Sequence, residues 1–168
     1  PILSREGRVL GTFAPYPNEI SRPGARELDL VALATDLAAV AIARYQEESA
    51  LRESEARFRQ LFEVAPLPLC LINADGSLGG LNRSYTETFG YTHEDVPNLS
   101  VMWPLAYPDP EYRDWVIRTW SAAVSKANAT HSAVEPLEVR VTCKNGEVRT
   151  VMASGAAVGD STLVTFFD

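Results

Sequence analysis

The apolar and polar positions divide the chain into a helical first part and a mixed second part. No proline or glycine occurs between Ala25 and Pro66, so nothing in this stretch breaks a helix. The pattern predicts one nearly continuous helix over residues 24–63, or two helices joined near Ala50. Ser21 is expected to cap it, and Pro23 fits its first turn. The first half has one broad apolar face, made of Leu28, Val31, Leu37, Ala38, Ala41, Ile42 and Tyr45.

Residues 46–55 of this helix are polar, and only a thin apolar stripe continues through them. The stripe consists of Tyr45, Leu51, Phe58, Leu61 and Phe62. An exposed helix of this polarity gains little stability by itself. We therefore expect a helical connector that forms a parallel homodimer and buries Leu51, Phe58 and Phe62, with a monomeric helix as the alternative. Three charged residues lie near the expected dimer interface, Arg44, Glu48 and Glu55. The affinity of the dimer is therefore expected to be modest.

The residues before the helix predict the end of a β-hairpin. A turn at residues 6–8 precedes a short apolar strand over residues 9–14, and a loop with Pro15 and Pro17 follows. One hairpin and one helix have no sheet to cover. This opening segment is therefore expected to be the end of a truncated domain.

The pattern after Pro66 predicts two strands and a short helix. An apolar run over residues 67–72 and a strand over residues 77–81 flank the Asp75-Gly76 turn. Asn82 is placed to cap a short helix that carries Tyr85 and Phe89 and ends at Gly90. Residues 92–95 resemble a second capped turn, which Pro97 ends.

A long helix and three strands complete the pattern. The helix begins at Asp109-Pro110-Glu111, an N-cap followed by an N1 proline and an acid. The face expected to be buried carries Tyr112, Trp115, Val116, Thr119, Trp120, Ala123 and Val124. Strands are expected over residues 137–143, 148–158 and 162–167, the first two joined by Asn145-Gly146. The fold class is α+β, with helices on one face of a five-stranded antiparallel sheet.

This order of elements resembles the PAS domain. The likeness rests on Phe58-Arg59-Gln60-Leu61-Phe62-Glu63 before Ala65-Pro66, on Asp75-Gly76 followed by Asn82, on Phe89-Gly90-Tyr91-Thr92, on Asn145-Gly146 and on the final Asp168. The opening is similar to the last strand and closing helix of a GAF domain. Its residues are Gly7 to Ala14, Pro23, Glu27-Leu28, Leu37-Ala38 and Ala41-Ile42. The resemblance implies a GAF-like fragment over residues 1–48, a helical connector over 49–64 and a PAS domain over 65–168.

Composition and charge exclude several classes of protein. Hydrophobic residues make up 46% of the chain and charged residues 22%, as in globular domains. The net charge is −7, with 8 basic and 10 acidic residues before Pro66 and the larger acidic excess after it, so nucleic acid is not expected as a partner. The longest apolar run, residues 37–43, is too short to cross a membrane, and no signal peptide opens the chain. We therefore expect a cytoplasmic protein.

The cysteines and histidines do not form a metal-binding pattern. Cys70 and Cys143 lie far apart in sequence, and His93 and His131 are isolated, so no metal site is expected. The sheet order of the resembled family separates the strands of the two cysteines by two others, which predicts two free thiols. No nucleophile–base pair or nucleotide-binding loop occurs, so the chain is not expected to be an enzyme.

The candidate site is a ligand pocket lined by aromatic residues. The expected lining is Tyr85, Phe89, Trp103, Trp115, Trp120 and Met152. Ordinary core packing of the same residues is the alternative. The resemblance argues against two cofactors: residues 82–85 lack the cysteine of flavin photoreceptors, and residues 112–126 lack the axial histidine of haem-binding members. An unidentified small-molecule ligand remains open.

Three functions agree with these observations. The first is a sensory module of a bacterial signal-transduction protein, of the sensor histidine kinase or diguanylate cyclase type, which relays to an output domain absent here. The second is an interaction and dimerisation scaffold without a ligand. The third, a cofactor-dependent enzyme or photoreceptor, is weakened by the missing ligands.

Overall fold

The computed structural model describes residues 1–14 and 24–167, which divide into a unit over residues 1–58 and a second unit from residue 59 onward. The expected cap Ser21, the prolines of the preceding loop and Asp168 lie outside the described residues.

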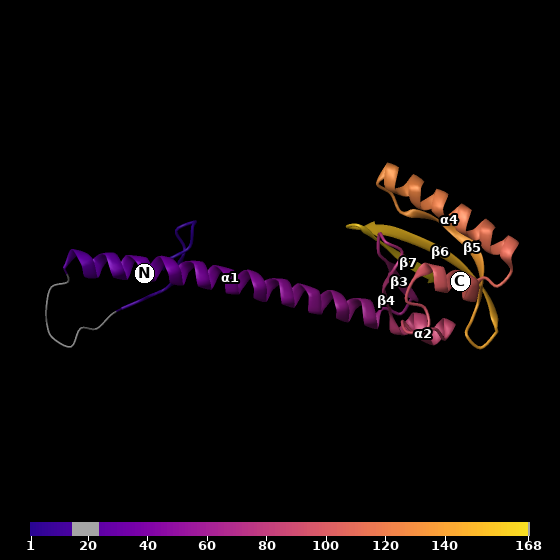
Figure 1. Ribbon diagram of the computed structural model, residues 1–168, viewed down its shortest axis with the longest axis horizontal. Coiled ribbons are helices and arrows are strands. Elements are labelled where there is room, and N and C mark those ends of the chain that lie inside the picture. Colours follow the sequence, from indigo (N-terminus) through magenta and orange to yellow (C-terminus); the bar gives the residue numbers. More distant parts are fainter. Residues whose placement is uncertain (15–23, 168) are drawn as a thin grey trace. The chain divides into compact units, whose positions relative to one another are not determined.

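The first unit contains a hairpin and most of one long helix (Figure 1). Strands β1 (Ile2–Leu3) and β2 (Val9–Gly11) pair antiparallel around Gly7, whose φ of 80° lies in the left-handed region. The second strand is shorter than the expected span of residues 9–14. Helix α1 runs from Ala25 to Val64 without a break, which confirms the continuous helix.

An exposed stripe of large apolar residues follows α1 at alternating spacings of three and four. We call it the α1 seam, and within the first unit it contains Leu30, Leu33, Leu37, Val40, Leu51 and Phe58. Arg44, Glu47 and Ser54 occupy the intervening positions of the same repeat. The expected seam residues Glu48 and Glu55 are therefore offset by one position, and Glu48 instead pairs with Arg44 at 3.0 Å. Spacing of this kind is typical of helices that pair lengthwise.

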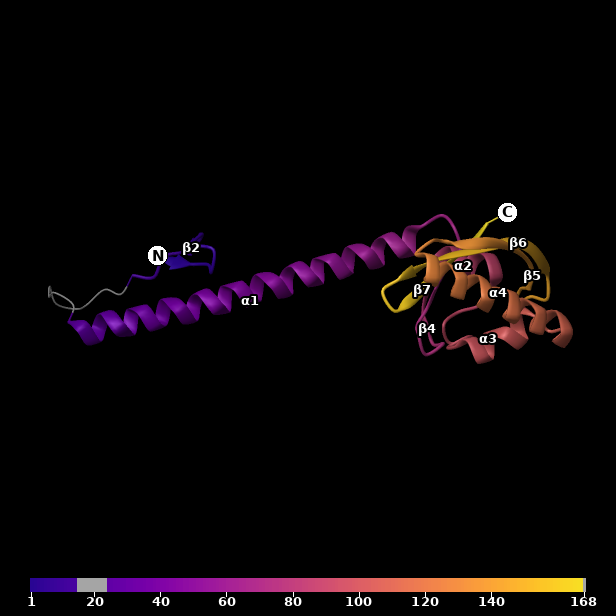
Figure 2. The same cartoon turned by 90° about the horizontal axis from the view of Figure 1, so that it is seen from above.

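The second unit is built on a five-stranded antiparallel sheet. Its strands are β3 (Leu69–Ile72), β4 (Leu78–Leu81), β5 (Val134–Thr142), β6 (Val148–Val158) and β7 (Ser161–Phe167). Their spatial order is β4-β3-β7-β6-β5, so the last strand lies beside the first. Helices α2 (Arg83–Phe89), α3 (Leu99–Ala106) and α4 (Pro110–Thr130) pack on the face that carries the core (Figure 2). The predicted fold class is confirmed.

Local signals explain where α2 and α4 begin and end. The side chain of Asn82 accepts a hydrogen bond from the Tyr85 amide, and Gly90 ends α2 in the left-handed region with φ 79°. Asp109 caps α4 in the same way through the Tyr112 amide. These are the positions that the sequence predicted.

Helix α3 was not predicted from the sequence. It begins at the cap Asn98, whose side chain accepts from the Val101 amide, and it contains Pro104. A proline inside a helix removes one backbone hydrogen bond, and here the helix ends two residues later, which limits the loss. The expected turn at residues 92–95 is present, but it precedes α3 rather than forming a helix.

The core lies between the sheet and the three helices. Tyr85, Phe89 and Phe166 form an aromatic cluster with ring centroids 4.9 to 5.8 Å apart. Cys70 on β3 and Cys143 just after β5 are both buried free thiols, and β7 and β6 separate their strands. Despite the length of α1, no helix in the described part of the chain is long and apolar enough to cross a membrane.

Candidate functional site

A small cavity lies inside the core of the second unit. Its volume is about 30 Å³, and its walls come from β3, β5, β6, β7, α3 and α4. It is lined by Cys70, Ile72, Met102, Trp103, Tyr107, Val116, Trp120, Leu137, Val139, Ala153, Val164 and Phe166. Since no lining residue is acidic, basic or a histidine, the cavity offers no partner for a charged ligand.

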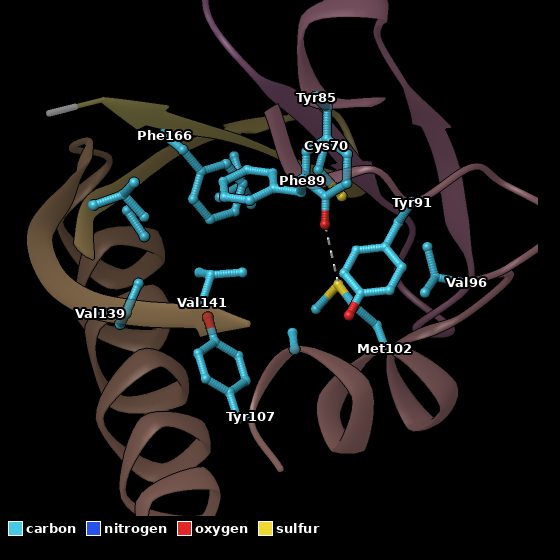
Figure 3. Packing of buried hydrophobic residues seen from close by; sticks show 14 of the residues in the cluster. Cys70, Tyr85, Phe89, Tyr91, Val96, Met102, Tyr107, Val139, Val141 and Phe166 are labelled. Atoms are coloured by element: carbon cyan, nitrogen blue, oxygen red, sulfur yellow. Dashed lines mark hydrogen bonds between the residues drawn. The ribbon is translucent and has the colours of Figure 1, made fainter. Parts of the chain in front are cut away.

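The expected pocket residues fall in four different places. Trp103 and Trp120 line the cavity. Tyr85 and Phe89 lie in the adjoining core without lining it, and the Tyr85 hydroxyl points to the Met102 sulfur at 3.9 Å (Figure 3). These two positions are a correction to the expected lining.

Trp115 and Met152 are further corrections. Trp115 is 42% exposed and stacks on Tyr112, with ring centroids 5.5 Å apart, so the expected buried face of α4 is narrower than its apolar stripe. Met152 alternates with the buried Val151 and Ala153 along β6, which places it on the sheet face away from the cavity.

Tyr107 is one of ten cavity residues that the expected lining did not include, and it is the one that carries a hydroxyl. It is the C-cap of α3, and it lies between the end of that helix and Pro108, outside any periodic segment. The one available signal was an aromatic residue directly before a proline and a helix cap. Burial raises the pKa of its hydroxyl, with a smaller contribution from Tyr112, so the phenol stays protonated.

The thiol of Cys70, the other titratable group of the cavity wall, is also uncharged at neutral pH. Burial raises the pKa of the Cys70 thiol to about 12, so Cys70 is a thiol and not a thiolate at neutral pH. Among residues 1–14 and 24–167, no three or more His, Cys, Asp or Glu side chains gather in a group that could hold a metal ion. The arrangement suits non-covalent binding rather than acid–base or nucleophilic chemistry.

Asn82 connects the wall of the cavity to the end of α1. Its side-chain oxygen accepts from the amides of Leu69 and Tyr85 at 2.8 and 2.9 Å. Its side-chain nitrogen donates to the carbonyls of Leu67 at 2.9 Å and of Ala65 at 3.3 Å. Because Leu69 precedes the cavity residue Cys70 on β3, and Ala65 follows α1, one fully buried side chain holds both.

A second junction joins α2 to the hairpin of β5 and β6. The Lys144 amide donates to the Phe89 carbonyl at 2.9 Å, and the Lys144 ammonium binds Asp95 at 2.7 Å. The Tyr91 hydroxyl lies 3.0 Å from the Thr142 carbonyl, to which it donates. The Phe89-Gly90-Tyr91-Thr92 motif therefore holds the end of α2 against this hairpin.

Residues 56–123 match the sequence model of the PAS domain family. They are part of a PAS domain. Over 100 residues the chain is 36% identical to the methyl sulfide methyltransferase-associated sensor of Methanosarcina acetivorans. The match covers 59% of this chain and spans 10% of the length of that relative.

Solved structures show the same fold as this PAS domain. The LOV protein of Rhodobacter sphaeroides is 17% identical with a TM-score of 0.53, and covers 68% of this chain and 67% of its own. A PAS domain from Colwellia psychrerythraea is 14% identical with a TM-score of 0.53, and covers 67% of this chain and 94% of its own. The PAS domain of a LuxR-family transcriptional regulator from Burkholderia thailandensis, in complex with ethanol, is 18% identical with a TM-score of 0.51, and covers 66% of this chain and 96% of its own.

Proposed function

We propose that the PAS domain senses a small molecule in its core cavity and that α1 transmits the response within a larger signalling protein. The output would be a catalytic domain of the sensor histidine kinase or diguanylate cyclase type. The observation that carries this proposal is the apolar cavity, because a ligand inside it contacts α3, α4 and four strands at once. Such a ligand can favour one packing of these elements over another.

The cavity and α1 share a short physical connection. Cys70 lines the cavity, its neighbour Leu69 binds the Asn82 side chain, and the same side chain binds the carbonyl of Ala65 after α1. A shift of β3 on ligand binding would therefore change the position of the last turn of α1. This connection supports a relay through α1.

Dimerisation through α1 is part of the same proposal. The α1 seam leaves large apolar side chains exposed, and a parallel second copy of the chain would bury them. The polar positions Arg44 and Glu47 interrupt the seam, so the dimer is expected to be modest. Residues 1–48 are proposed as the end of a GAF-like domain, residues 49–64 as the connector and residues 65–168 as the PAS domain, in a cytoplasmic protein.

One observation favours a second function, an interaction scaffold that binds no ligand. The cavity volume of about 30 Å³ is small, and the surrounding core is well filled. A domain of this kind would act through the α1 seam alone.

Xenon binding separates the two functions, because xenon enters apolar cavities without needing a hydrogen bond. Xenon pressure should shift the methyl NMR signals of Val116 and Val139 in the wild-type chain. Ala153→Leu places a larger side chain at the buried cavity wall and should abolish the shifts, whereas Ala156→Leu, at an exposed position of the same strand, should retain them. Wild-type signals that do not respond to xenon would favour the scaffold.

Sedimentation tests the dimer. The Leu37→Glu, Leu51→Glu double variant should shift the chain to monomer, and Gln46→Glu, which adds charge away from the seam, should not. A wild type that stays monomeric at high concentration, or a double variant that dimerises equally well, would contradict pairing through α1.

A further inference from the structure

Tyr107 lines the cavity, and its hydroxyl is a hydrogen-bond donor without a partner among the described residues. Tyr107 is 5% exposed, and among the described residues its hydroxyl has no hydrogen bond. Figure 3 shows the side chain pointing into the core, with the hydroxyl oxygen directed toward Val141. The hydroxyl oxygen is not fully enclosed by protein atoms, so it can donate a hydrogen bond to a molecule that enters the cavity.

The surrounding structure keeps this hydroxyl in place. The Tyr107 carbonyl accepts from the Arg113 guanidinium at 2.9 Å, which anchors the backbone. The ring lies between Trp103 and Tyr112, with centroid distances of 5.6 and 6.1 Å. The side chain is therefore held by both backbone and ring contacts, and the donor is preorganised.

The rest of the cavity wall sets the chemistry of what can bind. The lining has no Asp, Glu, Lys, Arg or His, and the protonated phenol of Tyr107 can donate one hydrogen bond. A cavity needs roughly 10–15 Å³ to hold one water-sized group, so about 30 Å³ accommodates about two such groups. The ligand must therefore be neutral, very small and largely apolar.

We propose that Tyr107 recognises the ligand of this cavity, and that the ligand is a neutral molecule of about two or three non-hydrogen atoms with one hydrogen-bond acceptor, such as a short alcohol or aldehyde. The inference rests on the proposed sensory function and specifies its ligand class. The acceptor atom takes the hydrogen bond of the Tyr107 hydroxyl, and the carbon end contacts Val116, Val139 and Ala153.

The size of such a ligand limits its affinity. The free energy of binding per non-hydrogen atom has an upper bound, which keeps the dissociation constant of a two- or three-atom ligand at about 1 mM or weaker. The natural ligand would then be a solute present at millimolar concentration, and not a scarce signal.

Methanol and xenon are matched probes for this inference, because methanol has an acceptor and xenon has none. Each is titrated into the full chain while the methyl signals of Val116 and Val139 are followed by NMR. Tyr107→Phe removes the hydroxyl and keeps the ring, and should weaken methanol binding about fivefold without weakening xenon. Tyr112→Phe is the control, because its hydroxyl accepts from the Arg140 amide and Tyr112 does not line the cavity.

A second measurement needs no variant. The Cζ carbon of Tyr107, labelled with ¹³C in the wild-type chain, should shift with methanol and stay nearly unchanged with xenon. If xenon binds but methanol binds wild type and Tyr107→Phe equally well, Tyr107 does not recognise the ligand, and the sensory function still stands. The same conclusion follows if xenon binds but methanol leaves the Cζ signal unshifted. Failure of both probes to bind would overturn both proposals.

Discussion

The side-chain amide of Asn82 donates a hydrogen bond to the carbonyl of Ala65, at 3.3 Å. Ala65 is the residue after α1, and Asn82 is the cap of α2, so this hydrogen bond links the end of the long helix to the core of the PAS domain. A lone helix cap would need only one of the four hydrogen bonds that this side chain makes.

Alanine variants of the two asparagine caps, Asn82 and Asn98, can be compared to measure how much the additional hydrogen bonds of Asn82 contribute to stability. Asn82→Ala removes the partners of the partly buried Leu69 amide and Leu67 carbonyl as well as the cap itself, and should lower the free energy of unfolding by about 3–4 kcal/mol. Asn98→Ala removes the exposed cap of α3 and the exposed hydrogen bond from the Ser100 hydroxyl, and should cost about 1 kcal/mol. Urea unfolding measures both, and equal losses would mean that Asn82 acts as a cap alone.

The two tryptophans of α4 should differ in their effect on stability. Trp120→Ala removes a side chain from the cavity wall and should cost about 3 kcal/mol. Trp115→Ala removes a partly exposed ring stacked on Tyr112 and should cost about 1 kcal/mol. Thermal and urea unfolding of both variants measure the difference. A Trp115 loss as large as that of Trp120 would contradict the exposure of Trp115.

Alanine variants of the turn glycines Gly90 and Gly146 can be compared to separate the cost of backbone strain from the cost of steric crowding. Gly90 and Gly146 have φ values of 79° and 87°, so alanine is strained at both, by about 1 kcal/mol. An added Cβ at Gly90 would lie 3.1 Å from the Lys144 Cβ, whereas at Gly146 it meets nothing within 4 Å. Gly90→Ala should therefore be the more destabilising in urea unfolding. Equal losses would show that the junction with Lys144 adjusts freely.

The raised pKa of Cys70 predicts a loss of stability at alkaline pH. The folded state holds the thiol proton up to about pH 12, whereas the unfolded chain releases it near pH 9. The unfolded state then binds fewer protons, so stability falls as pH rises above 9, by up to about 1.4 kcal/mol per pH unit.

Cys70→Ala should remove this part of the pH dependence, although it lowers stability at every pH. Urea unfolding of both proteins between pH 8 and 10 tests the prediction. Below pH 10 the unfolded tyrosines remain largely protonated, so they contribute little. Parallel pH profiles of wild type and variant would show that Cys70 is not the group responsible.

The elements with local signals could be predicted from the sequence. Asn82 with Gly90 bounds α2, Asp109 with Pro110 begins α4, and the absence of proline and glycine gives α1. Helix α3 has an apolar sequence with Pro104 inside it, so neither periodicity nor a stop signal was visible.

The candidate site was predicted only in part, because its lining depends on tertiary packing. Trp103 and Trp120 could be selected as large apolar side chains, but the same criterion selected Trp115 and Met152, which face elsewhere. Tyr107 lies at a helix end with no periodic neighbours. Its ring contacts Trp103 four residues earlier and its carbonyl binds Arg113 six residues later, but this spacing is informative only once α3 is known, and α3 was not predicted from the sequence.

The seven-residue repeat of α1 constrains how the length of this helix can change. Each residue turns a helix by about 100°, so inserting or deleting one residue would rotate all later seam positions by that angle. A change of seven residues leaves a mismatch of only about 20° while altering the helix length by about 10 Å. The proposed pairing through α1 therefore predicts that variation in the length of this helix occurs in steps of seven, which keeps Leu37 and Leu51 on one line.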